Sequence, residues 1–187
     1  MKMENTPSLT FPPELLLRAQ GVRVAIFDVD GVLTDGGLFF SAEGEALKRF
    51  HTLDGHGLKL LAQAGIVPAV ISGRDSPALR QRLAGLGVRH LRLGTEEKLA
   101  AARALLDELQ ADWPQVAAIG DDWPDLPLLA CAAFACAPAD AHAEARARAH
   151  YVTTARGGQG AAREFCDLLL VACGRYRALL EQALAGS

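Results

Sequence analysis

Short apolar runs rich in β-branched residues alternate with segments of helical character along most of this chain. The apolar runs predict buried strands, with one short edge strand near the end of the series. The predicted strands are 22–27, 67–71, 88–91, 116–119, 132–136 and 151–152. The predicted helices are 14–19, 54–64, 76–86, 95–110 capped by Thr95, 125–130, one capped by Asp140, and 161–184 with a break at Gly174. Because the two kinds of segment alternate, the pattern predicts a parallel sheet with helices on both faces.

A second pattern interrupts this alternation directly after the first strand. Apolar segments at 38–40 and 46–50 flank a turn that contains Gly44, which is typical of a β-hairpin. We therefore expect one doubly wound (Rossmann-like) α/β domain over residues 21–187, with a hairpin inserted after its first strand. Residues 1–20 are expected to form an N-terminal arm. The length of 187 residues suits a single domain with a good core.

Composition narrows the functional classes that this fold could serve. The formal net charge is −3 and no block of basic residues is present, so we expect no nucleic-acid partner. No apolar run approaches the roughly 20 residues that span a bilayer, and residues 1–13 lack a secretory signal, so we expect no membrane partner. The four cysteines lack C-x-x-C spacing and stand in apolar surroundings, as core cysteines of a reducing compartment do. A cytoplasmic protein is therefore expected.

Reactive side chains gather where the predicted strands and one helix end or begin. They are Asp28, Asp30, Ser72, Lys98, Asp121, Asp122 and Asp125. Because the carboxyl ends of parallel strands share one edge of the sheet, residues far apart in sequence can meet there. Taken singly, each has an ordinary reading as a turn residue, a helix cap or a solvated lysine. Their joint occurrence at successive ends favours a common site.

Carboxylates crowded at one edge of a sheet need a counter-charge. Like charges at close range either share protons or bind a cation. Ligands that are all oxygen favour a hard ion, most simply Mg²⁺. A cation beside a lysine and a hydroxyl suits a phosphate group, and the chain has no G-x-x-x-x-G-K-[ST] loop for nucleotide hydrolysis. The edge is therefore predicted to bind Mg²⁺ and a phosphorylated small molecule.

The same residues resemble the motifs of the haloacid dehalogenase superfamily of phosphatases. Residues 28–35 read D-V-D-G-V-L-T-D, which matches its first motif, D-x-D-G-x-x-T-D. Ser72 after an apolar strand, then Lys98, then G-D-D-W-P-D at 120–125 match the remaining motifs in order. The resemblance therefore covers the whole set of strand-end residues.

The resemblance implies a role for each of these residues. Asp28 would be the nucleophile that forms an aspartyl-phosphate, and Asp30 would be the general acid and then the general base. Ser72 and Lys98 would hold the phosphoryl oxygens. The implied metal ligands and supporting groups are Asp28, Asp121 and the backbone carbonyl of Asp30, with Asp122 and Asp125 in support.

The intervals between the motifs leave no room for a cap domain. Residues 30–72 hold only the hairpin and one helix, and residues 74–98 hold one helix and one strand. Further segments carry a closer resemblance: residues 31–36, the hairpin, and residues 54–59, 72–74, 120–127 and 157–164. Together they resemble a capless branch, the 3-deoxy-D-manno-octulosonate 8-phosphate phosphatases of lipopolysaccharide sugar synthesis. The substrate would be a sugar-acid phosphate, bound by Thr34, Gly73, Arg74 and Arg156. The alternatives are a phosphatase of nine-carbon sialic-type sugar phosphates and a non-catalytic oligomeric binding module.

Two further segments are expected to link assembly with substrate recognition. The hairpin carries several large apolar residues, which predicts a subunit contact; the alternative is that it packs on its own domain. The resembled branch pairs such hairpins in a homotetramer. The link at 153–160 is expected to be flexible because it is rich in glycine. It carries Arg156, which by the resemblance would reach a neighbouring subunit's site; the alternative places it in solvent. His51 and His56 could be sugar contacts or surface residues.

Overall fold

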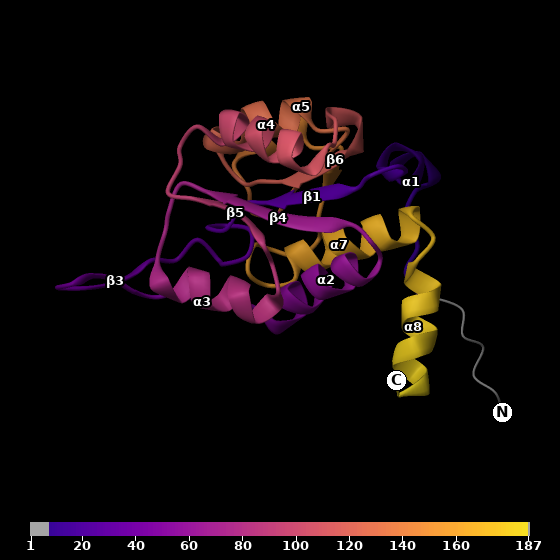
Figure 1. Cartoon of the computed structure of the whole chain (residues 1–187), viewed down its shortest axis with the longest axis horizontal. Helices are drawn as coiled ribbons and strands as arrows, with labels where there is room; N and C mark the ends of the chain where they lie inside the picture. Colours follow the sequence, from indigo (N-terminus) through magenta and orange to yellow (C-terminus); the bar gives the residue numbers. More distant parts are fainter. Residues whose placement is uncertain (1–7, 187) are drawn as a thin grey trace.

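The computed structural model describes residues 8–186, and its centre is a six-stranded parallel sheet (Figure 1). The strands are β1 (Val24–Phe27), β4 (Val67–Ser72), β5 (His90–Leu93), β6 (Val116–Ile119), β7 (Phe134–Ala137) and β8 (Tyr151–Val152). They lie in the order β5-β4-β1-β6-β7-β8, and each neighbouring pair is parallel. The doubly wound α/β fold predicted from the sequence is confirmed.

Helices cover both faces of this sheet. They are α1 (Pro13–Ala19), α2 (Thr52–Gln63), α3 (Pro77–Leu86), α4 (Lys98–Leu109), α5 (Leu126–Cys131), α6 (Ala143–Arg148), α7 (Ala161–Ala172) and α8 (Tyr176–Ala185), with 3-10 turns η1 (Trp113–Gln115) and η2 (Trp123–Asp125). Figure 1 shows α4 and α5 over one face of the sheet and α2, α3 and α7 over the other. The predicted break at Gly174 is confirmed, because α7 and α8 are separate helices on either side of it.

Strand β1 shows why its sequence is apolar throughout. All four of its residues are buried, and successive side chains point to opposite faces of the sheet. Phe27 enters the core beneath α2 and α7, where its ring meets Phe165 edge-on at 5.4 Å. Ile26 enters the opposite core together with Leu105 of α4. The first strand is therefore fixed from both sides, and so is the loop that follows it.

The predicted hairpin is present as a separate two-stranded antiparallel sheet of β2 (Phe39–Ser41) and β3 (Gly44–Leu47). It extends away from the body of the protein in Figure 1. The second strand ends at Leu47, so the predicted segment 46–50 is wrong in its bounds. The reason is that the Lys48 side chain bonds to Asp30 and the Phe50 ring packs against the core.

No cap domain occurs in the part of the chain that the structure describes. Only the hairpin and α2 lie between β1 and β4, and only α3 and β5 lie between β4 and α4. The carboxyl edge of the sheet therefore has no covering domain from residues 8–186.

Two of the predicted helix caps are wrong. Helix α4 begins at Lys98 because the Thr95 N–H donates to the Ser72 carbonyl at 3.1 Å, which holds Thr95 beside the end of β4. Helix α6 is capped by His142, whose Nδ1 accepts from the Glu144 N–H, and not by Asp140.

Strand β5 begins two residues later than predicted. The Val88 N–H donates to the Leu83 carbonyl at 3.1 Å and so closes the end of α3 instead of joining the sheet. The strand therefore covers His90–Leu93, opposite Ala69 to Ser72 of β4.

The expectation of a flexible glycine-rich link at 153–160 is also wrong. This segment, here called the glycine strap, lies against residues 28–36, here called the first loop. The Gly158 N–H donates to the Val32 carbonyl at 2.9 Å, and the Gly157 N–H donates to Asp140 Oδ1 at 2.9 Å. A Cβ atom on Gly157 would lie 1.9 Å from the Gly31 carbonyl oxygen. The glycines therefore permit close contact between two backbones, which their number alone did not reveal.

Candidate active site

Asp28, directly after β1, meets Lys98 from the first turn of α4. The Lys98 ammonium donates to Asp28 Oδ1 at 2.7 Å and to Asp125 Oδ1 at 2.7 Å. All three side chains are buried. A buried ammonium needs such carboxylate partners to compensate for lost hydration. Three segments that are far apart in sequence are therefore joined at one point, as the order of the motifs predicted.

Asp125 organises the loop that follows β6. Its Oδ1 accepts from Lys98, and its Oδ2 accepts from the backbone N–H groups of Asp121 at 3.1 Å and Asp122 at 3.4 Å. Gly120 makes room for this arrangement, since a Cβ there would lie 2.4 Å from the Asp125 Cβ. These contacts are consistent with the predicted supporting role of Asp125, because they hold both Lys98 and the backbone at Asp121.

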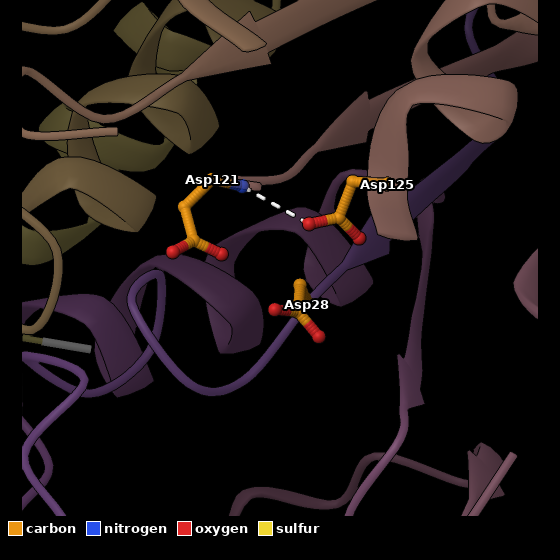
Figure 2. Close-up of side chains that lie close together, drawn as sticks. All are labelled: Asp28, Asp121 and Asp125. Carbon is orange, nitrogen blue, oxygen red and sulfur yellow. Dashed lines mark hydrogen bonds between the residues drawn. The ribbon is translucent and has the colours of Figure 1, made fainter. Parts of the chain in front are cut away.

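Asp28, Asp121 and Asp125 converge on one small volume, as Figure 2 shows. One carboxylate oxygen from each lies within 4.8 Å of the others. Gly31 permits the approach, because it adopts a φ of +86° and a Cβ there would lie 2.1 Å from Asp121 Oδ2. The first loop therefore closes over Asp121 only with glycine at this position.

The electrostatics of this cluster favour a bound cation. Burial raises the pKa of Asp28 to about 6, with the charge of Asp125 adding to the effect and Lys98 opposing it. Burial raises the pKa of Asp121 to about 8, with the charges of Asp28 and Asp125 adding to it. Burial opposes the charge on Lys98, but its two carboxylate partners together raise its pKa. The carboxyls therefore retain protons that a divalent cation would replace.

The donor set fits Mg²⁺. The oxygens of Asp28 and Asp121 are hard ligands of the kind that this ion prefers. Both oxygens of Asp125 already accept hydrogen bonds, so Asp125 supports the site better than it would ligate the ion. The Asp28 and Asp121 carboxylates would thus hold the metal, and the Asp30 carbonyl remains the predicted third ligand.

Asp30 and Arg74 belong to the wall of an open cleft of about 950 Å³ at this edge of the sheet. The Arg74 Nε lies 3.6 Å from Asp30 Oδ2, and Lys48 donates to Asp30 Oδ1 at 2.5 Å. Ser72 is buried at the end of β4, and its Oγ accepts from the Arg74 N–H at 3.1 Å. The strand-end residues thus do face a common cleft.

The cleft brings together most of the residues that the sequence singled out. Those that line it are Asp28, Asp30, Ser72, Gly73, Arg74, Lys98, Asp121 and Asp122. Thr34 does not line it: the Thr34 hydroxyl donates to the Val29 carbonyl at 3.3 Å and accepts from the Gly36 N–H, inside the first loop. Asp125 lies buried beneath the cleft, and Arg156 is exposed on the glycine strap, outside the lining.

Sequence reasoning missed several charged groups at the site. Glu96 and Glu97, just before Lys98, line the mouth of the cleft. Lys48 and Glu45 of the hairpin lie beside Asp30 and Arg74. The sequence shows that Glu45 and Lys48 are three residues apart, but it does not show that the Lys48 side chain points towards Asp30. That direction is what brings the pair to the site. His51 is now placed as the cap of α2, where its Nδ1 accepts from the Leu53 N–H.

The chain is similar in sequence and in fold to known phosphatases. The profile of haloacid dehalogenase-like hydrolases matches residues 94–165. The 3-deoxy-D-manno-octulosonate 8-phosphate phosphatase KdsC of Yersinia pestis is 44% identical over 159 residues, which cover 85% of each chain. KdsC of Escherichia coli K12 is 41% identical over 162 residues, covering 87% of this chain and 86% of that protein.

Solved structures agree with the sequence relatives. A probable YrbI family phosphatase from Pseudomonas syringae superposes with a TM-score of 0.90 at 45% identity, covering 92% of this chain and 98% of that one. The 3-deoxy-D-manno-octulosonate 8-phosphate phosphatase of Moraxella catarrhalis, solved with magnesium, phosphate and KDO, superposes at 0.87 with 37% identity, covering 90% and 97% of the two chains. The chain therefore belongs to the haloacid dehalogenase-like hydrolases, within the family of the 3-deoxy-D-manno-octulosonate 8-phosphate phosphatases.

Proposed function

We propose that this protein is a Mg²⁺-dependent phosphatase that releases phosphate from 3-deoxy-D-manno-octulosonate 8-phosphate, in lipopolysaccharide sugar synthesis. The observation that carries the proposal is the buried Asp28–Lys98–Asp125 cluster at the floor of an open cleft. The relatives named for this activity match most of the chain. Mg²⁺, phosphate and KDO occur together in the Moraxella structure, which supports both the cofactor and the substrate class.

The chemistry follows from the positions of two aspartates. In the first step the Asp28 carboxylate attacks phosphorus, and Asp30 gives a proton to the leaving sugar oxygen. In the second step the Asp30 carboxylate removes a proton from water, which attacks the aspartyl-phosphate and releases Asp28. Lys98 and Ser72 lie beside Asp28 in the cleft and would hold the phosphoryl oxygens. When bound, Mg²⁺ would supply positive charge that offsets the repulsion between carboxylate and phosphate.

The cleft also explains how a sugar acid could be held without a cap. Arg74 lines the cleft and its side chain is about half exposed, so its guanidinium can reach a substrate carboxylate. Gly73 lies beside Arg74 in the lining, and a Cβ there would meet only the Thr95 carbonyl oxygen within 4 Å, at 3.9 Å. Thr34 would act through the shape of the first loop, because its hydroxyl is used within that loop.

We further propose a cytoplasmic homotetramer. The exposed apolar side chains of the hairpin support assembly. The cysteines are free, as expected in a reducing compartment. Among residues 8–186, no helix has the length and apolar character needed to cross a membrane.

A phosphate-release assay over sugar phosphates, with and without Mg²⁺, tests the proposed function. The eight-carbon sugar-acid phosphate should be the best substrate, and chelation should stop turnover. Asp28→Asn should lower kcat by roughly 10⁴-fold or more, because the amide keeps the shape but cannot attack phosphorus. Asp107→Asn, on the exposed face of α4, is the matched control and should retain wild-type activity.

Three outcomes would contradict the proposal. Preference for a nine-carbon sugar-acid phosphate would identify the enzyme as the alternative, a phosphatase of nine-carbon sialic-type sugar phosphates. Full activity in excess chelator would remove the metal from the reaction. Absence of turnover on every phosphate ester would favour the non-catalytic binding module.

A further inference from the structure

Lys48 has an unusual position for a residue of an exposed hairpin. It follows β3 directly, but its side chain is only 1% exposed. The ammonium lies 2.5 Å from Asp30 Oδ1 and 3.1 Å from Glu45 Oε1. The lysine therefore leaves the hairpin surface and ends beside the aspartate to which the acid–base role falls.

The burial of this ammonium needs a physical reason. A lysine side chain normally keeps its charge in water, and burying it is costly unless carboxylates compensate. Lys48 has two such partners, and the Asp30 partner belongs to the cleft wall. The neighbouring Arg49 shows the ordinary alternative, since it is 58% exposed and pairs with Asp35 at 2.8 Å. Lys48 is thus bound inward, whereas Arg49 remains in solvent.

The contact distinguishes the two oxygens of Asp30. Oδ1 accepts from Lys48 at 2.5 Å, whereas Oδ2 lies 3.6 Å from the Arg74 Nε, beyond hydrogen-bond distance. Both Asp30 and Arg74 line the cleft. Oδ2 is therefore the oxygen that remains available to a substrate.

A second lysine makes an equivalent contact at the same site. Lys98 donates to Asp28 Oδ1 and is fixed by the core helix α4, while Lys48 donates to Asp30 Oδ1 and comes from the hairpin. Each aspartate of the first motif is thus held through one oxygen by one buried lysine. A carboxyl group that rotates freely delivers a proton less efficiently than one held in a single orientation.

We propose that Lys48 is a positioning residue that orients the Asp30 carboxyl so that Oδ2 delivers and then recovers the proton of the reaction. The inference rests on the proposed function, because it requires Asp30 to be the acid. In the first step, the proton on Oδ2 moves to the bridging oxygen as the bond from that oxygen to phosphorus breaks and the Asp28–phosphorus bond forms. In the second step, Oδ2 takes a proton from the attacking water as the Asp28–phosphorus bond breaks.

The test compares two aryl esters, phenyl phosphate and p-nitrophenyl phosphate, on the full-length Mg²⁺-loaded protein. Phenolate needs protonation more than p-nitrophenolate does, so loss of acid catalysis falls mainly on phenyl phosphate. Lys48→Met should lower kcat on phenyl phosphate by about 10²-fold and on p-nitrophenyl phosphate by about threefold or less. Arg49→Met, the exposed neighbour, is the matched control and should change neither rate.

A second variant keeps the test valid if Lys48→Met does not fold. Lys48→Gln retains a neutral donor that can still reach Asp30, so its selective loss on phenyl phosphate should be about tenfold. Turnover of p-nitrophenyl phosphate near the wild-type rate reports that the site is assembled in either variant. Equal losses on both esters would assign Lys48 to hairpin structure and overturn the inference. Unchanged rates on both esters would overturn it as well.

Asp30→Asn separates failure of this inference from failure of the proposed function. If Asp30→Asn is selectively impaired on phenyl phosphate and Lys48→Met is not, only the role of Lys48 is wrong. If Asp30→Asn loses both activities equally, Asp30 is not the acid, and the acid role of Asp30 and the positioning role of Lys48 fail together.

Discussion

The glycine strap and the hairpin both contact the first loop, but they do so in opposite ways. The strap lies against the loop backbone, with Gly157 and Gly158 buried and hydrogen-bonded. The hairpin reaches the loop through two ion pairs, Lys48 with Asp30 and Arg49 with Asp35, and leaves most of its apolar surface in solvent. The strap backbone is thus packed within a single chain, whereas the hairpin is not.

The difference extends to how each segment is anchored. The Glu164 carboxylate accepts from the N–H groups of Thr154 and Ala155 at 3.0 to 3.1 Å, and Asp54 accepts from the Gly160 N–H at 3.3 Å. The strap is therefore held at both ends by buried or half-buried carboxylates. The hairpin forms its own small sheet and pairs with no strand of the six-stranded sheet. A segment that is hydrogen-bonded into the fold and a segment that leaves its apolar side chains exposed can thus flank the same loop.

The largest expected effect comes from adding a methyl group to the strap. Gly157→Ala places a Cβ 1.9 Å from the Gly31 carbonyl oxygen, which is backbone and cannot rotate away. We expect the free energy of unfolding to fall by about 3 kcal/mol or more, and turnover to fall with it as the first loop shifts. Gly85→Ala in α3 is the matched control: nothing lies within 4 Å, so it should stabilise by about 0.5–1 kcal/mol. Equal effects in chemical denaturation would contradict the packing role of the strap.

The strap also shows where prediction from sequence ended. The strands, their parallel arrangement and the convergence of Asp28, Lys98 and Asp121 followed from apolar periodicity and from the shared edge of parallel strands. The order of the strands in the sheet was not predicted. The glycines of the strap were misread, because the same residues serve flexible links and close backbone contacts. Only the neighbouring backbone at Gly31 decides between the two, and that neighbour is distant in sequence.

Lys48 and Thr34 show the same limit at the level of side chains. A lysine after an exposed strand is usually solvated, and nothing in its local sequence reveals that Asp30 lies within reach. Thr34 belongs to the recognised motif, but its hydroxyl is used inside the loop. Motifs therefore identified which residues gather, while the direction of each side chain depended on long-range packing.

Mg²⁺ is expected to change the free energy of unfolding by a smaller amount than the strap substitution. The ion would bind on the side of the first loop that faces Asp121. In the metal-free protein, the pKa values of Asp28 and Asp121 rise from 3.8 to about 6 and about 8. Because folded pKa values are raised, the stability due to these groups is complete below about pH 4 and is lost as pH rises through 6 and 8. Mg²⁺ would take the place of the protons on these carboxyls, so the stabilisation of the folded protein by Mg²⁺ should increase from pH 6 to pH 8. It should reach about 2.7 kcal/mol when the Mg²⁺ concentration is 100 times its Kd.

Thermal unfolding at pH 6 and pH 8, with Mg²⁺ or with chelator, checks this expectation. The hairpin variants described below should respond to Mg²⁺ as the wild type does, because the hairpin contributes no ligand. Stabilisation by Mg²⁺ that is larger at pH 6 than at pH 8 would contradict the assignment of Asp28 and Asp121 as ligands.

Arg156 tests whether the strap also serves recognition. Its backbone is fixed with the strap, but its side chain is exposed and outside the cleft of its own chain. If it meets the substrate carboxylate in a neighbouring subunit, Arg156→Ala should raise KM for the sugar-acid phosphate about tenfold, or about 1.4 kcal/mol. KM for p-nitrophenyl phosphate, which has no carboxylate, should not change. Arg103→Ala, at an exposed position of α4, is the control. A similar KM change on both substrates, or none on either, would leave Arg156 in solvent.

The smallest effect on the stability of one chain, and the sharpest contrast with the strap, is expected at the hairpin. Phe39, Phe40 and Leu47 are 49%, 64% and 66% exposed, and a two-stranded ribbon with so much apolar surface is at best marginally stable on its own in water. The double variant Phe40→Ser, Leu47→Ser should change the unfolding free energy of the dissociated chain by only about 0.5 kcal/mol per substitution, since neither residue is packed. It should nevertheless abolish association, because the apolar surface that drives it is gone. Sedimentation and light scattering at micromolar concentration would show a wild-type oligomer and a monomeric variant. A monomeric wild type would instead mean that the hairpin, like the strap, is complete within one chain.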